Sequence, residues 1–101
     1  MFMNLSNEQR LKMYEHVAMY LDSHYESVID AGLTDDILLA EYKAGLASIS
    51  DTNLDEEERQ KQIDWLSILV WQMIECSVNN LAEGRKNLVY ANFIKTISEL
   101  F

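Results

Sequence analysis

Apolar residues recur every three or four positions along most of this chain, and that spacing is typical of one face of an α-helix. The pattern, together with the residues that flank each stretch, predicts four helices at about residues 7–31, 35–48, 54–82 and 88–101. Two of them are long and two are short. We therefore expect an all-α fold, a small and mostly antiparallel helical bundle that forms a single domain over residues 1–101.

The residues at the ends of these stretches suit helix termini. Side chains that accept hydrogen bonds from free backbone N–H groups are expected where each helix begins. The predicted N-caps are Ser6, Thr34, Asn53 and Asn87. Gly32 and Gly84 follow the first and third stretches, where a left-handed residue commonly ends a helix. The chain has no proline and only three glycines, so few residues interrupt the helices between these points.

Residues 65–74 form the most apolar stretch, with eight apolar residues in ten. On a helix, one side would present the core residues Ile63, Leu66, Leu69, Val70 and Met73. Ile68 and Trp71 would lie on the opposite side, between Asp64 and Glu75. Apolar side chains rimmed by charge are typical of protein interfaces. We therefore predict that Ile68 and Trp71 bind protein and that the chain forms a homodimer through this helix. The alternative is that another helix covers this side.

The first helix is expected to bury one stripe and to expose an acidic flank. The stripe consists of Leu11, Tyr14, Val17, Ala18, Leu21, Tyr25 and Val28. Beside it, Met13, Tyr20 and His24 form a second row that should extend the core rather than line a ligand pocket. On the other flank, Glu15, Asp22 and Glu26 lie in one row. We predict that these three carboxylates contact a basic surface on a partner protein. The alternative is a solvated face that keeps the protein soluble.

The charge of the chain is both acidic and uneven. The formal net charge is −9 at pH 7, and residues 1–58 hold 13 acids and 3 bases, whereas residues 59–101 hold 4 acids and 5 bases. Direct binding of nucleic acid needs a basic footprint, so we expect none. The acidity favours a solubilising surface or a face for a basic protein partner.

Residue patterns that carry catalysis or bind cofactors are missing. His16 and His24 are eight residues apart, which is about 12 Å along a helix, so they cannot share a metal ion unaided. Cys76 lies in an apolar stretch and is expected to be a core residue. We predict no enzyme activity, no cofactor and no metal. The start of the chain lacks a signal-peptide pattern and no apolar run is long enough for a membrane span, so a cytoplasmic location is expected.

These features favour a small, acidic, non-enzymatic regulator or inhibitor that binds another protein and self-associates. In size and class, the chain resembles small acidic helical inhibitors such as bacteriocin-immunity bundles and phage inhibitors of host enzymes. The alternative is a DNA mimic, a phage-type anti-defence inhibitor whose carboxylates stand in for phosphates and block a nucleic-acid-binding protein.

Overall fold

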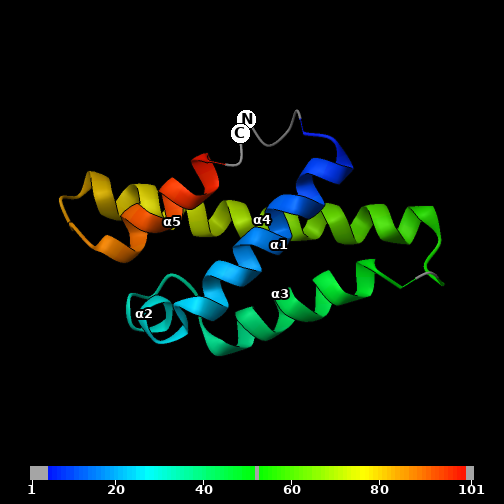
Figure 1. The fold of residues 1–101 in the computed structure, drawn as a ribbon, viewed down its shortest axis with the longest axis horizontal. Helices are drawn as coiled ribbons and strands as arrows, with labels where there is room; N and C mark the ends of the chain where they lie inside the picture. The colour runs from blue at the N-terminus through cyan, green and yellow to red at the C-terminus, as the bar shows by residue number, and fades with distance from the viewer. Residues whose placement is uncertain (1–4, 52, 100–101) are drawn as a thin grey trace.

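The computed structural model describes residues 5–51 and 53–99, and these form five α-helices (Figure 1). The helices are α1 (Asn7–Ser23), α2 (Tyr25–Asp30), α3 (Asp36–Ile49), α4 (Glu56–Ala82) and α5 (Leu88–Ser98). No strand occurs among the described residues, so the predicted all-α class is confirmed. The predicted end of the last helix, at residue 101, lies outside them.

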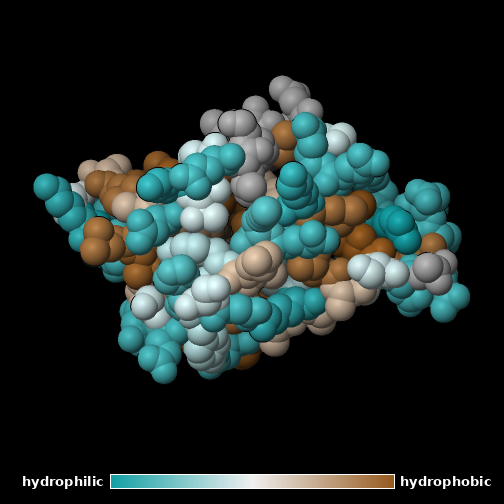
Figure 2. Space-filling view, in the orientation of Figure 1, coloured by the Kyte–Doolittle hydropathy of each residue, from teal (hydrophilic) through white to brown (hydrophobic). Residues whose placement is uncertain are grey.

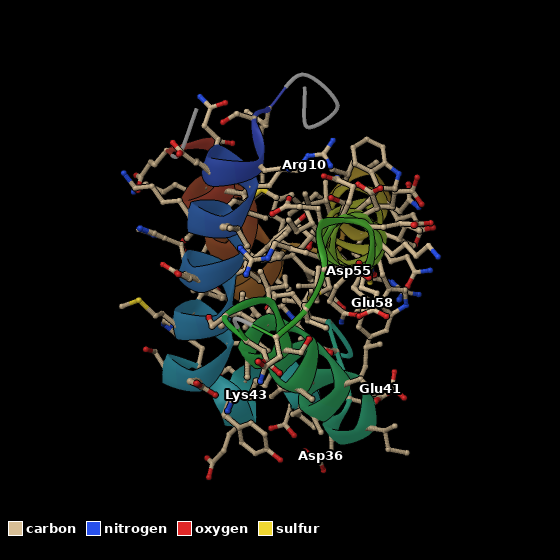
Figure 3. All side chains as sticks on the ribbon, turned by 90° about the vertical axis from the view of Figure 1, so that its right-hand side faces the viewer. Arg10, Asp36, Glu41, Lys43, Asp55 and Glu58 are labelled. Carbon is tan, nitrogen blue, oxygen red and sulfur yellow. The ribbon has the colours of Figure 1, made fainter. Side chains whose placement is uncertain are left out.

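Helix α4 is the longest helix of the bundle and the one that the other long helices contact. Its 27 residues run along the longest dimension of the molecule, and α1, α3 and α5 all pack against it (Figure 1). Helix α3 runs antiparallel to α4, while α1 and α5 both cross α4 at an angle. The Cα atoms span 45 × 28 × 18 Å. Because helices pack about 8–10 Å apart, 18 Å accommodates only two layers. In the view along α4 in Figure 3, α1 lies beside α4 and α3 lies below it.

The prediction of one continuous helix over residues 7–31 is wrong, because the chain breaks at His24. The backbone of His24 has φ −120° and ψ 31°, which is outside the helical region, and it separates α1 from α2. The imidazole stacks on the ring of Tyr20 with the ring centroids 4.4 Å apart. The apolar periodicity continues through this break, so the sequence pattern does not reveal it.

The break changes which residue of α2 faces the core. Tyr25 was expected in the buried stripe, but 43% of its surface is exposed and its hydroxyl bonds to the carboxylate of Asp36. Val28 is fully buried, as predicted. The break at His24 therefore places the Tyr25 side chain against the start of α3 instead of in the core.

Two of the four predicted N-caps are confirmed. Ser6 and Gln9 form a complete capping box at the start of α1, and the side chain of Asn87 accepts a hydrogen bond from the N–H of Val89. Gly32 and Gly84 have φ of +74° and +79°, as expected for left-handed residues that end a helix.

The other two N-caps were predicted one and two residues too early. Asp35, not Thr34, caps α3 and accepts from the N–H of Leu38 at 2.7 Å. Asp55, not Asn53, caps α4 and accepts from the N–H of Glu58 at 2.8 Å. In both cases a carboxylate takes the position, and its negative charge is favoured at the positive end of the helix dipole.

Tyrosine hydroxyl groups link the helices through the core. Tyr14 on α1 donates to the carbonyl oxygen of Ile63 on α4 at 2.8 Å, and Tyr42 on α3 donates to the carbonyl oxygen of Tyr14 at 2.6 Å. Tyr20 on α1 donates to Val89 at 3.1 Å. Burial raises the pKa of Tyr14 and of Tyr42 above the ordinary value of about 10.

The crossing of α3 and α4 is close because Gly45 lies at it. A Cβ atom on Gly45 would lie 2.5 Å from the amide nitrogen of Gln62, 3.1 Å from the ring of Trp65 and 3.2 Å from Leu66. The absence of a side chain at Gly45 therefore permits the close approach of α3 to α4.

Candidate protein-binding face

One row of exposed residues runs along the full length of α4, on the side away from the core. Its members are spaced alternately four and three positions apart, and every one of them is exposed. We call this row the α4 seam; it consists of Glu57, Lys61, Asp64, Ile68, Trp71, Glu75, Val78 and Ala82. Alternating steps of four and three keep side chains on one line of a helix, as in the seam of a coiled coil.

The middle of the seam is apolar and open to solvent. The exposed fractions are 55% for Ile68, 41% for Trp71 and 49% for Val78. Figure 3 looks along α4 from its N-terminal end, near Asp55 and Glu58, and shows no other helix on the outer side of α4. The alternative considered from the sequence, that a further helix covers this side, does not hold for the described part of the chain.

The side of α4 that faces the core consists of the residues that the sequence predicted there. The five predicted core residues, Ile63, Leu66, Leu69, Val70 and Met73, are all buried. Cys76 is partly buried and packs against the core cluster. The helix therefore presents one apolar face inward and a second, narrower one outward.

The charged groups along the seam are largely neutralised within the molecule. Glu57 pairs with Lys61 at 3.7 Å, and Asp64 pairs with Arg10 of α1 at 2.9 Å. The indole N–H of Trp71 donates to Glu75 at 2.6 Å. This bond satisfies the polar edge of the indole, and 41% of the Trp71 surface is exposed.

The predicted acidic row on α1 does not remain a single row. Asp22 forms an ion pair with Lys43 of α3 at 2.5 Å. Glu26 belongs to α2, beyond the break at His24, so helical spacing no longer aligns it with the other two. Glu15 is exposed on α1 and lines a groove that also contains Arg59. The three carboxylates are thus in three different surroundings.

Sequence reasoning missed several residues of these surfaces. Val78 lies seven positions after Trp71, and the same helical spacing could have included it. Lys43 and Arg59 come from helices other than α1, so only the packing of α3 and α4 against α1 brings them near its acids.

Within residues 5–51 and 53–99, no three side chains of histidine, cysteine, aspartate or glutamate are grouped so that they could hold a metal ion. No helix in the same ranges combines the length and the hydropathy that crossing a membrane requires.

Comparison with known proteins gives no relative from which a function could be transferred. No protein family, curated protein or solved structure matches this chain. The functional proposal therefore depends on the geometry and the charges described above.

Proposed function

We propose that this protein is a non-enzymatic regulator that acts by binding another protein, and that it works as a homodimer joined through the α4 seam. The observation that carries the proposal is the exposed apolar centre of that seam, Ile68, Trp71 and Val78, on a helix whose outer side no described helix covers. Exposed apolar patches with charged rims mark interaction sites more often than chance allows.

Charge favours a second copy of the chain as the occupant of this face. Two molecules with net charge −9 repel each other at most orientations. Along the seam, however, Glu57 is offset by Lys61 and Asp64 by Arg10, which leaves only Glu75 without a basic partner. The seam is therefore a face where two copies can approach with little like-charge repulsion.

The ends of α4 favour antiparallel pairing. Glu56, Glu57 and Glu58 crowd its first turn, whereas its last residue is followed by Glu83, Arg85 and Lys86, which together carry a net charge of +1 and in which Arg85 pairs with Glu83 at 3.8 Å. Glu57 and Arg85 are each 14 positions from Trp71. Antiparallel seams that cross near Trp71 would bring the acidic end of one copy close to the basic end of the other. Parallel pairing would place acids against acids.

Such a dimer would leave the acidic side of the molecule free. Of the 13 acids in residues 1–58, seven lie on α1, α2 and α3, outside the seam. We propose that this side, including Glu15, Asp22 and Glu26, meets a partner protein with a basic surface. Complementary charge of this kind mainly accelerates association and selects the partner.

The test of the dimer is the replacement of Trp71 by glutamate. A charge at the centre of a buried contact is strongly unfavourable, whereas the same charge in water is tolerated. Trp71→Glu should raise the dimer dissociation constant by at least about thirtyfold, measured by analytical ultracentrifugation, with an unchanged circular dichroism spectrum.

The matched control is Ile37→Glu, an equal change at an exposed apolar residue of α3, outside the seam. This variant should remain dimeric. A wild-type protein that sediments as a monomer at tens of micromolar would overturn the dimer, and so would equal weakening by the two variants.

A further inference from the structure

A groove separate from the α4 seam opens between α1, α3 and the first turn of α4. Its volume is about 390 Å³, and it is lined by Leu11, Glu15, Leu46, Ile49, Ser50 and Arg59. Figure 2 shows an apolar hollow between α1 and α3 in this region, bordered by polar residues. The volume falls in the range of about 300–1,000 Å³ that is usual for small-molecule sites.

Arg59 brings an unsatisfied donor to this groove. Its Nε–H is buried and has no hydrogen-bond partner, and one Nη donates to the carbonyl oxygen of Asp51 over a long 3.4 Å. A buried donor without an acceptor is unfavourable, so a rotation of the guanidinium that presents Nε–H to an acceptor in the groove would be favoured. Nε–H and a neighbouring Nη–H form the fork that binds both oxygens of a carboxylate.

Glu15 supplies the opposite charge on the same groove. Its carboxylate makes no hydrogen bond or ion pair with any residue that the structure describes. A ligand that carried only a carboxylate would be repelled by Glu15 and by the net charge of −9. A ligand with an ammonium group as well as a carboxylate would be neutral overall and would suit both side chains.

We propose that the groove binds a free aliphatic α-amino acid. The carboxylate pairs with the fork of Arg59, the ammonium group faces Glu15, and the aliphatic side chain lies against Leu11, Leu46 and Ile49. Each part of the ligand thus matches a part of the lining. The site lies apart from the α4 seam, so the proposal does not depend on the dimer.

The experiment titrates the wild-type protein with three ligands that differ in one group each. L-leucine has both charges, 4-methylpentanoate lacks the ammonium group, and L-leucinamide lacks the carboxylate. L-leucine should give saturable shifts of the methyl NMR signals of Leu11, Leu46 and Ile49, and each analogue should bind at least about tenfold more weakly. Absence of saturable shifts with L-leucine up to tens of millimolar would overturn the proposal, and so would equal binding of either analogue.

Two variants then assign the roles of the charged residues. Arg59→Gln should weaken L-leucine binding by about tenfold or more, and Glu15→Gln should weaken L-leucine while strengthening 4-methylpentanoate. The control is Arg85→Gln, an exposed arginine outside the groove, which should leave binding unchanged. If Arg59→Gln does not fold by circular dichroism, the opposite responses of the two ligands to Glu15→Gln decide the case, and a parallel response would refute it.

Discussion

At the scale of single residues, buried tyrosine hydroxyls make this protein sensitive to alkali. Burial raises the pKa of Tyr14 and Tyr42 in the folded protein, whereas in the unfolded chain both stay near about 10. As the pH rises above about 10, the unfolded chain loses phenolic protons that the folded protein retains. The free energy of unfolding should therefore be constant with respect to these groups up to about pH 10 and fall above it.

The variant Tyr42→Phe tests the larger of the two tyrosine contributions to the loss of stability in alkali. The variant loses the hydrogen bond to the carbonyl oxygen of Tyr14, so its free energy of unfolding should be lower by about 1 kcal/mol at pH 7. It also loses an ionisable buried group, so stability should decline less steeply above pH 10. Urea denaturation at pH 7, 9, 10 and 11 measures both effects.

The control for Tyr42 is Tyr25→Phe, because Tyr25 lies at the surface. Removal of the Tyr25 hydroxyl should change the stability at pH 7 and its decline in alkali less than removal of the Tyr42 hydroxyl does. An alkaline decline as steep in Tyr42→Phe as in the wild type would show that other groups cause it.

The sequence correctly predicts most of the buried residues, but it wrongly places Tyr25 among them. Tyr14, Val17, Leu21 and Val28 follow the helical period and are buried as expected. Tyr25 follows the same period, but its neighbour His24 leaves the helical conformation, so Tyr25 turns to Asp36. A stacking contact with Tyr20 accompanies that change, and no glycine or proline signals it. Periodicity alone therefore cannot locate such a break.

At the scale of helices, the contact between α3 and α4 depends on the missing side chain of Gly45. In an exposed helix, alanine is about 1 kcal/mol more favourable than glycine. Here the added methyl group would press on Trp65 and Leu66 as well as on the movable end of Gln62. Gly45→Ala should therefore give no increase in the free energy of unfolding, and Gly45→Leu should lower it by roughly 1–3 kcal/mol.

The exposed residue Ala47 on the same helix provides the reference for Gly45. Ala47→Gly should lower the free energy of unfolding by about 1 kcal/mol, which reports the helix propensity without the crossing. Chemical denaturation of the three variants tests the comparison. If Gly45→Ala stabilised the protein by the amount that Ala47→Gly destabilises it, the close contact would have no energetic importance.

The α-helical class follows from local sequence, whereas the break at His24 and the helix surfaces do not. Two of the four capping residues and the inner face of α4 are readable because they depend on neighbours within one or two turns. The groove with Glu15 and Arg59 joins residues 44 positions apart, and the Asp22–Lys43 pair joins α1 to α3. These residues are far apart in the sequence, so no local pattern reveals that they are neighbours in the fold. The acidic row predicted from α1 alone was therefore incomplete.

At the scale of the whole molecule, the uneven charge distinguishes the two proposed kinds of association. The α4 seam is close to neutral, while α1, α2 and α3 together hold seven acids and three bases. Two copies that meet through the seam still carry a net charge of −9 each, so added salt screens their mutual repulsion. A basic partner that meets the acidic side is attracted instead, so added salt weakens that complex.

Salt dependence should therefore have opposite signs for the two interfaces. Between about 50 and 500 mM NaCl, the dissociation constant of the homodimer should fall modestly, whereas that of a complex with a basic protein should rise.

The double variant Asp22→Lys, Glu26→Lys changes the net charge by four units towards neutrality and should flatten both dependences. The lost pair between Asp22 and Lys43 is exposed, so the variant should be destabilised by no more than about 1 kcal/mol. Sedimentation at several salt concentrations measures the dimer, and stopped-flow association measures the complex. A homodimer that dissociates as salt is added would show that ion pairs, not the apolar centre around Trp71, hold it together.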